Sequence, residues 1–389
     1  MNKNSQHEKK QHLQITTVCV TVMSIFIAVI FGVLILSIVL PDREKSETEN
    51  RVLKQFPKFS FSALTDGSFM KNFETYFNDQ FPFRDGFITL KTKIDRATGK
   101  REENGVYIGK DGFLFESPTK PDKSQIKELT KAVTAFSRSN KKLKKAFLLS
   151  PNASDMMPEK LPSALKIENR ADAFSQIKKG CSGVSWIDCK GAFEKQEDKS
   201  ALFYRTDHHW TTRAAYVAFK ELSSLWKLGA KDKNYSFYTV SSSFQGTLSS
   251  SAAINDYADK IEICVPKNQE GKYTVLYESS NKKTASLFES EKLRQKNQYE
   301  VFLGGNYDKV IISTAADTSA SLLVFKDSYA NCLLPMLTPY FSKIVVIDPR
   351  YFSDSLKAVM SETKFTHVLF LYNMDTFLGD TSLVSALES

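Results

Sequence analysis

Residues 15–40 form a continuous apolar run without a single charged side chain. A run of this length can cross the ~30 Å hydrocarbon core of a bilayer as a helix. It is longer than the apolar part of most cleaved signal peptides, and it ends at Pro41 without a small-x-small cleavage pattern. We therefore expect a retained transmembrane signal anchor at residues 15–40, which leaves residues 41–389 to fold outside the bilayer.

Charges flank this run asymmetrically. Three lysines lie in residues 1–14, whereas four carboxylates crowd residues 42–49 on the far side. Because positively charged residues next to a membrane helix are retained in the cytoplasm, residues 1–14 are predicted to be a cytoplasmic tail. The predicted location is the cell membrane, with a single pass and an extracytoplasmic C-terminal domain.

The net charge restricts the class of partner. The chain carries a formal charge of +9, of which residues 1–14 contribute +2, so residues 41–389 carry +7. This excess favours an anionic partner such as a wall polymer, a phospholipid headgroup or an acidic glycan. The sequence lacks a basic run interleaved with aromatic residues, so a nucleic-acid partner is not expected.

The spacing of the cysteines predicts neither a metal site nor a particular disulfide. Cys181, Cys189, Cys264 and Cys332 follow the membrane run, and their spacing is not that of a zinc site. In an oxidising compartment these four cysteines allow three pairings, and free buried thiols are an equal alternative. No metal and no cofactor is predicted.

Residues 41–104 are expected to form a linker and a helical lead-in. Residues 41–50 are charged and lack apolar periodicity, which is typical of a linker. Four aromatic residues between Phe69 and Phe77 then recur at helical intervals. This spacing predicts an amphipathic helix.

From residue 105 to residue 389, short apolar runs alternate with amphipathic stretches. This alternation indicates a parallel sheet with helices on both faces, that is, a three-layer α/β domain. Residues 233–305 break the rhythm with Ser, Lys, Asn and Tyr, so we expect a β-rich insertion there. The predicted strands are residues 145–149, 183–187, 321–325, 344–347 and 367–371, and the predicted helices are residues 122–140, 212–228, 329–338 and 353–362.

The histidines point to one polar segment. The chain has five histidines, and only His208 and His209 lie in a polar setting beside a carboxylate. A general base needs an imidazole whose far nitrogen is held by an acceptor, and Asp207 can hold His209 in this way. The alternative is structural, since Asp207 could instead cap the helix predicted near residue 212.

Other polar residues stand where predicted strands end. Ligands of open α/β sheets bind at the carboxyl ends of the strands. Ser328 stands at a strand-to-helix turn, where its hydroxyl would be exposed and backbone N–H groups could stabilise an oxyanion. Asn373 could donate its amide to the same oxyanion, and Arg350 could orient a sugar hydroxyl or a carboxylate. The alternatives are an N-cap role for Ser328 and loop-forming roles for Asn373 and Arg350.

The block Thr206-Asp207-His208-His209-Trp210 resembles the DHHW proteins of Gram-positive bacteria. More distantly, it resembles the alginate O-acetyltransferase group with its SGNH hydrolase-like domain. Further blocks resemble this family in the same order over most of residues 49–389. They are Glu49-Asn50-Arg51, Gly67-x-Phe69, Phe73-Glu74-x-Tyr76, Phe81-Pro82-x-Arg84, Gly109-x-Asp111-Gly112-x-Leu114-Phe115, Phe302-Leu303-Gly304-Gly305-Asn306, Phe325-Lys326-Asp327-Ser328-Tyr329 and Ile347-Asp348-x-Arg350-Tyr351.

The resemblance implies site residues and a partner. It implies that Asp207 and His209 form the Asp-x-His element, that Ser328 is the nucleophile, and that Asn373 takes the place of an oxyanion-hole asparagine. The Asp-His element precedes the serine, as in the permuted alginate-type group. A single anchor helix offers no path for an acetyl group across the bilayer. The resemblance therefore implies a multi-pass membrane-bound O-acyltransferase as the acyl donor.

We therefore predict an SGNH hydrolase-like serine O-acyltransferase that acetylates a cell-surface or secreted polysaccharide. Tyr329 and Arg350 are assigned to the oxyanion and the substrate, His208 to a supporting role, and Trp210 to stacking on a sugar. A polysaccharide acetylesterase would use the same triad. A catalytically inactive glycan-binding protein of an exopolysaccharide assembly would keep the same fold, so both remain alternatives.

A metal-dependent phosphoesterase is disfavoured, although Asp207-His208-His209 spells the triplet of one manganese-dependent class. Such a site needs several more Asp and His ligands. The remaining histidine after residue 209 is His367, which opens an apolar run predicted to be a strand.

Overall fold

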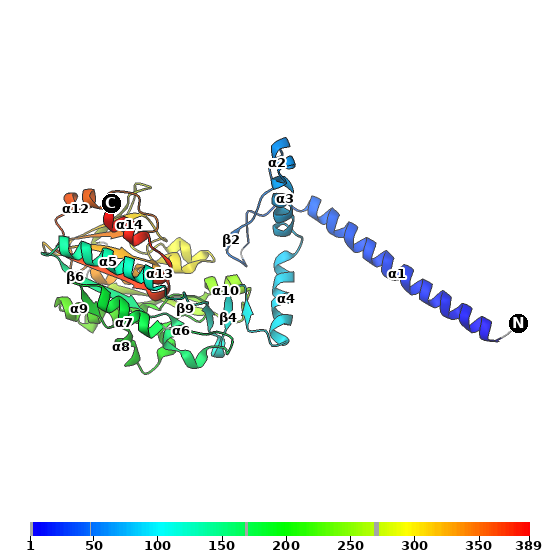
Figure 1. The fold of residues 1–389 in the computed structure, drawn as a ribbon, viewed down its shortest axis with the longest axis horizontal. Helices are drawn as coiled ribbons and strands as arrows, with labels where there is room; N and C mark the ends of the chain where they lie inside the picture. Colours follow the sequence, from blue (N-terminus) through cyan, green and yellow to red (C-terminus); the bar gives the residue numbers. More distant parts are fainter. Residues whose placement is uncertain (1–2, 47, 168–169, 268–271) are drawn as a thin grey trace. The chain divides into compact units, whose positions relative to one another are not determined.

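The uncharged run lies in one continuous helix, α1 (Lys3–Val39), drawn in blue in Figure 1. The computed structural model describes residues 3–46, 48–167, 170–267 and 272–389. Within α1, His12–Val39 is long and apolar enough to cross a membrane, and its most apolar 18 residues have a mean hydropathy of 3.0. This stretch contains residues 15–39 of the predicted span at residues 15–40.

The chain divides into two units, Met1–Ile94 and Asp95–Ser389. After α1, the first unit contains a short antiparallel ribbon and three helices, and the third of these helices continues into the second unit. The predicted aromatic helix is α3. The elements are β1 (Lys45–Ser46), β2 (Arg51–Val52), α2 (Phe61–Thr65), α3 (Ser68–Asp79) and α4 (Arg84–Ala97).

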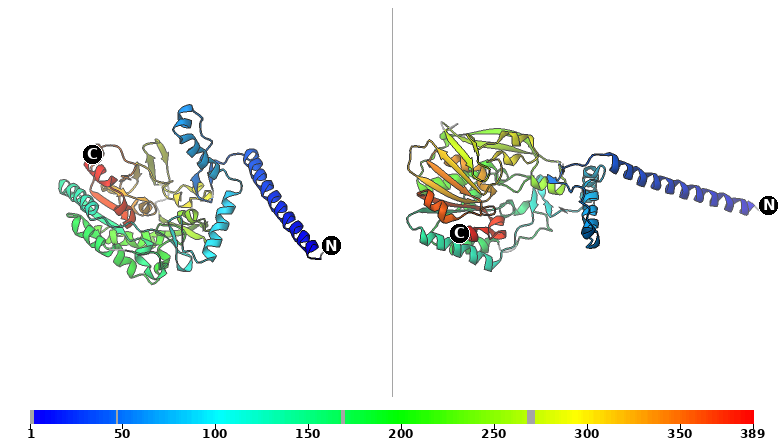
Figure 2. Two further views of the ribbon diagram at one scale, coloured as in Figure 1. Left: turned by 45° about the vertical axis from the view of Figure 1, so that its right-hand side comes forward. Right: turned by 90° about the horizontal axis from the view of Figure 1, so that it is seen from above.

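The second unit is built on one sheet, and all five predicted strands belong to it. They run parallel in the order β14-β13-β15-β6-β7. Figure 2 shows strands of this sheet lying side by side. The bounds are β6 (Lys144–Ser150), β7 (Ser185–Ile187), β13 (Ser321–Lys326), β14 (Lys343–Ile347) and β15 (His367–Asn373).

Three strands paired antiparallel extend the predicted parallel sheet, so the sheet as a whole is mixed. β12 (Lys309–Thr314) pairs with β14, and β10 (Tyr273–Tyr277) and β11 (Lys282–Thr284) continue the edge. β10 and β11 come from the region predicted as an insertion, whereas β8 (Tyr235–Phe244) and β9 (Asp259–Pro266) form a separate ribbon. β12 runs antiparallel to its neighbour β14, which comes later in the chain.

Alternate residues of the central strands face two different apolar layers. In β13, Leu323 and Phe325 pack on one side, and Leu322 and Val324 pack on the other. All six residues of β13 are buried, as expected for a strand covered on both faces. The first layer contains α5 (Lys123–Ser139), α7 (Arg170–Gly180), α12 (Leu356–Glu362), α13 (Met374–Gly379) and α14 (Ser382–Glu388), and the second contains α8 (Cys189–Glu194) and α9 (Thr212–Trp226).

Shorter elements complete the second unit. The helix predicted at residues 329–338 is divided into η7 (Ser328–Cys332) and α11 (Leu334–Leu337), with a proline at the start of α11. The five cysteines are free, and the four that follow α1 are buried. The other elements used below are β3 (Glu102–Glu103), β4 (Val106–Ile108), β5 (Leu114–Glu116), α6 (Ala153–Met156), α10 (Thr247–Ala252) and η6 (Gln298–Val301).

Replacing Phe370 in β15 by alanine should destabilise the second unit strongly. The ring has no exposed surface and stacks on Phe325 and Phe147, with centroid distances of 5.2 and 5.7 Å. A Phe→Ala cavity in a core costs about 3–5 kcal/mol, which urea unfolding of the detergent-solubilised chain would measure. Tyr238→Ala, at a residue 51% exposed, is the control and should cost under about 1 kcal/mol. Equal losses in the two variants would contradict the core position of Phe370.

Candidate active site

Three predicted side chains form one hydrogen-bonded chain. His209 Nε2 lies 2.7 Å from Ser328 Oγ, and His209 Nδ1 lies 2.6 Å from Asp207 Oδ1. Asp207 and His209 are buried, whereas Ser328 is partly exposed. The arrangement therefore places an accessible hydroxyl next to an oriented imidazole, which is the geometry of nucleophilic catalysis.

Ser328 is the first residue of η7, directly after β13. The N-cap of η7 is Asp327, whose Oδ1 accepts the Tyr329 backbone N–H at 2.9 Å. The alternative role of Ser328 as an N-cap is therefore taken by its neighbour. As a result, the hydroxyl of Ser328 is available to His209.

Asp207 is held from both sides. Its Oδ1 also accepts the His209 backbone N–H at 3.0 Å, and its Oδ2 accepts the Thr247 backbone N–H at 2.8 Å at the start of α10. The N-cap of α9 is Thr211, so Asp207 does not cap that helix. Thr247 was not predicted, because no local spacing connects it with residue 207.

The environment of this pair keeps the base neutral near pH 7. Burial lowers the pKa of His209 to about 4, the charge of His208 adds to the lowering, and Asp207 opposes it. Burial raises the pKa of Asp207, but His208, His209 and the Thr247 N–H outweigh this effect and hold it well below its usual value. A neutral imidazole beside a carboxylate can accept the Ser328 proton.

Aromatic residues pack around the imidazole. The ring of Tyr299 from η6 stacks on His209 with a centroid distance of 3.7 Å, a contact that no nearby motif signalled. The assignment of Trp210 to sugar stacking is wrong, because its side chain has no exposed surface. Instead, Trp210 Nε1 donates to the Tyr329 carbonyl oxygen at 2.9 Å and so supports the serine turn.

Asn373 does not offer a free amide to the serine. Its Nδ2 donates to Asp327 Oδ2 at 2.6 Å and to Thr376 Oγ1 at 2.8 Å, which uses both amide hydrogens. The prediction that it donates to an oxyanion is therefore wrong for this arrangement. Tyr329 is also buried, and its phenol donates to the His208 carbonyl oxygen, so its side chain is structural.

Arg350 lies beyond the end of β14 and is partly exposed. Its Nε and Nη2 donate to the buried Asp348 at 2.8 and 2.6 Å. The buried Lys326 Nζ donates to the same carboxylate at 3.1 Å. The charge of Arg350 contributes to lowering the pKa of His209.

His208 lies at the rim of a small cleft, with the ring centroid 4.0 Å from that of His209. Its Nδ1 lies 2.8 Å from Thr247 Oγ1, which agrees with a supporting role. Glu116, at the end of β5, lines the same cleft and was not predicted. Burial raises the pKa of Glu116 to about 7, and the charge of His208 opposes this effect.

The donor set does not favour a metal ion. Ligand atoms of Asp207, His208 and His209 lie within 4.8 Å of one another. However, both oxygens of Asp207 and the Nδ1 atoms of both histidines are already engaged in hydrogen bonds. The described residues gather no fourth His, Cys, Asp or Glu around this group.

Comparison with known families matches two segments of the chain. Residues 106–305, just over half of the chain, match the family described as SGNH hydrolase-like domain, acetyltransferase AlgX, and residues 49–110 match the DHHW protein family. A protein described as probable alginate O-acetylase AlgJ of Pseudomonas aeruginosa is 27% identical over 184 residues, which are 44% of this chain and 46% of that protein. The chain thus spans about half the length of the curated relatives it matches.

Two solved structures share the fold. A DHHW family protein from Eubacterium siraeum has a TM-score of 0.62 at 22% identity, covering 73% of this chain and 96% of its own. Bacillus cereus PatB1, solved with a sulfonyl adduct, has a TM-score of 0.61 at 17% identity, covering 72% of this chain and 98% of its own.

The pH dependence of serine acylation should reflect the lowered pKa of His209. Above about pH 4 the imidazole is neutral and accepts the proton, and below it the protonated ring cannot. The acid limb for acylation by an aryl acetate should therefore fall near pH 4 rather than near 6.5. His208→Gln should move the limb to higher pH, whereas His367→Gln in β15 should not. A limb near pH 6.5 in the parent protein would contradict the buried, neutral base.

Gly246 should be intolerant of any side chain, because it packs against the carboxylate of Asp207. A methyl group there would lie 2.2 Å from Asp207 Cβ and 2.4 Å from Oδ2. Gly246→Ala should displace the carboxylate from His209 and lower turnover by about a hundredfold. Gly86→Ala is the control, because a methyl group at that position would meet no atom within 4 Å. Parental turnover in Gly246→Ala would show that the carboxylate does not orient the base.

Proposed function

We propose that this chain is a serine O-acetyltransferase acting on a polysaccharide, because it belongs to the family of SGNH hydrolase-like acetyltransferase AlgX domains. The observation that carries the proposal is the hydrogen-bonded chain from Asp207 through His209 to Ser328. This arrangement supports acyl transfer through a covalent intermediate.

The reaction has two steps. Ser328 Oγ attacks the carbonyl carbon of an acyl donor while His209 Nε2 takes the hydroxyl proton, and the collapsing intermediate expels the donor alcohol with that proton. An acetyl-serine ester remains. A sugar hydroxyl then gives its proton to His209 and attacks this ester, which forms the sugar acetate and returns the proton to Ser328.

The developing oxyanion needs donors other than Asn373. The Ser328 backbone N–H begins η7 and has no partner within that helix, which supports it as one donor. Arg350 supports a second, because two of its guanidinium nitrogens are fixed on Asp348 and the rest of the group is available. Its positive charge also suits an anionic sugar.

The location of the acceptor follows from the topology. The apolar stretch of α1 supports a single-pass anchor, and the lysines before it support an extracytoplasmic position for residues 41–389. An acetyl group from the cytoplasm must then cross the bilayer, so we assign its delivery to a multi-pass membrane-bound O-acyltransferase. The name of the Pseudomonas relatives and the +7 charge support a polysaccharide, and an anionic one in particular, as the acceptor.

Replacing Ser328 by alanine should lower turnover of an artificial acyl ester by at least about a thousandfold. His209→Ala should lose a similar amount, and the double variant little more, because the pair acts as one unit. Intact-mass measurement should find an acetyl adduct on the parent chain and none on Ser328→Ala. Ser182→Ala, at an exposed serine, is the matched control.

In cells, polysaccharide acetylation should disappear with Ser328→Ala and also when the multi-pass donor is deleted. Acetylation that rises in Ser328→Ala cells would identify an acetylesterase instead. If Ser328→Ala cells acetylated the polysaccharide as much as the parent, the protein would be a glycan-binding protein without catalytic activity. Ser328-dependent acetylation without any multi-pass acyltransferase would exclude the relay.

A further inference from the structure

The helical segment that follows α1 leaves its apolar side chains uncovered. The described buried residues of α2, α3 and α4 are Asp79 and Thr92, and neither is apolar. A water-soluble unit rarely leaves a large contiguous apolar surface exposed. Ten large hydrophobic residues, here called the apolar face, are 37–79% exposed: Phe56, Phe59, Phe61, Leu64, Met70, Phe77, Phe83, Phe87, Leu90 and Ile94.

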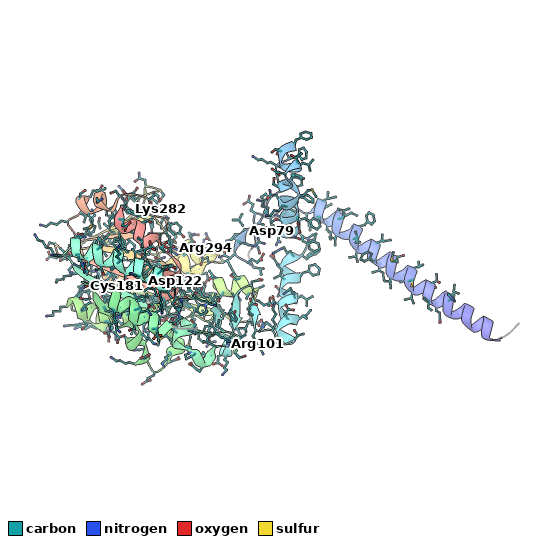
Figure 3. All side chains as sticks on the ribbon, in the orientation of Figure 1. Asp79, Arg101, Asp122, Cys181, Lys282 and Arg294 are labelled. Carbon is teal, nitrogen blue, oxygen red and sulfur yellow. The ribbon has the colours of Figure 1, made fainter. Side chains whose placement is uncertain are left out.

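Several charged side chains of this segment pair with one another. Asp79, labelled in Figure 3, is buried at the end of α3 and also accepts the Lys54 backbone N–H at 2.8 Å. A buried carboxylate beside exposed large apolar side chains is the reverse of the usual arrangement of a domain in water. Ion pairs within the segment include Arg51–Asp79, Arg43–Asp85 and Arg84–Glu49.

Hydrogen bonds hold the end of α3 close to the exit of the membrane helix. Tyr76 Oη donates to Asp42 Oδ1 at 3.0 Å, and Gln80 exchanges two hydrogen bonds of 2.9 Å with the backbone of Arg43. Asp42 and Arg43 follow Val39 within four residues, which is at most ~14 Å of extended chain. The end of α3 therefore lies at the depth of the lipid headgroups if α1 spans the bilayer.

The apolar side chains of α4 form a continuous stripe. Within α4, Phe87, Leu90 and Ile94 are spaced to share one face of the helix, and Phe83 directly precedes the helix. The ring of Phe81 lies 6.0 Å from that of Phe87 and 5.9 Å from that of Phe77, the latter in α3. The stripe therefore joins the apolar side chains of both helices.

We propose that the apolar face docks on the bilayer, at the boundary between headgroups and acyl chains, beside the membrane-spanning helix. The proposal rests on α1 spanning a membrane and is independent of the chemistry at Ser328. The occupant is the lipid boundary itself and not an anionic headgroup, because residues 41–94 contain nine Lys and Arg against eight Asp and Glu. Docking is therefore driven by apolar area and depends little on salt.

Depth-dependent quenching in vesicles of pure phosphatidylcholine tests this contact. The full chain, carrying Phe87→Trp or Leu90→Trp, is reconstituted with lipid brominated near the top of the acyl chains. The emission added by each new tryptophan should fall by at least about half, and it should resist aqueous acrylamide. The parent chain supplies the background of its three tryptophans. Tyr238→Trp, at a similarly exposed residue of the second unit, should instead respond to acrylamide and not to bromolipid.

Three other results would overturn the proposal. Emission quenched by acrylamide but not by bromolipid would place the apolar face in water. Protection from both quenchers would mean that protein covers it, either this chain's second unit or a second copy. If acrylamide quenches the tryptophan emission in vesicles but not in native membranes, then a membrane protein covers the apolar face in the native membrane. Because both tryptophans are on one helix, they should respond alike whether or not the helix contacts lipid. A difference between the two variants would indicate a folding defect in one of them.

Discussion

The buried carboxylate of Asp327 is the interaction on which the geometry of the site depends. It accepts the Tyr329 backbone N–H and two N–H groups of Asn373, so it connects the ends of β13 and β15. Burial raises the pKa of Asp327 to about 6, and these donors oppose the rise. Because Asp327 accepts the backbone N–H at the start of η7, the adjacent hydroxyl of Ser328 is free to form its hydrogen bond with His209. One structural carboxylate thus positions the Ser328 hydroxyl, and another, Asp207, orients the His209 imidazole.

The sheet supplies the rigidity that this arrangement needs. β13 is buried along its whole length and sends alternate side chains into two apolar layers, so a shift of one residue would exchange its faces. The turn after Lys326 is therefore fixed in position. On the opposite side of the site, the stacked ring of Tyr299 and the hydrogen bond from Trp210 limit the movement of the imidazole and of the serine turn. The base is preorganised before any substrate arrives.

Periodicity predicted the five parallel strands and the places of Ser328 and Arg350 after β13 and β14, because these signals are local. The resemblance of short blocks connected Ser328 with His209, which are 119 residues apart. Thr247, Gly246 and Tyr299 were missed, since their contacts with Asp207 and His209 arise only when the region around residues 233–305 folds back. Asn373 and Trp210 were given the wrong roles, because sequence shows a polar or aromatic side chain but not whether its hydrogen bonds and faces are already used. Strand β12 was missed for a similar reason, as its partner β14 lies later in the chain.

The four buried thiols of the second unit have a consequence for how the chain reaches its folded state. Burial raises the pKa of Cys181, Cys264 and Cys332 to about 12, and burial also raises the pKa of Cys189. Since the thiolate is the form that exchanges with disulfides, these residues are inert once the core has closed. Before the core closes, the thiols are accessible, and an oxidant could join the wrong pair of cysteines in a disulfide. The correct fold of the second unit therefore depends on the core closing before these thiols are oxidised.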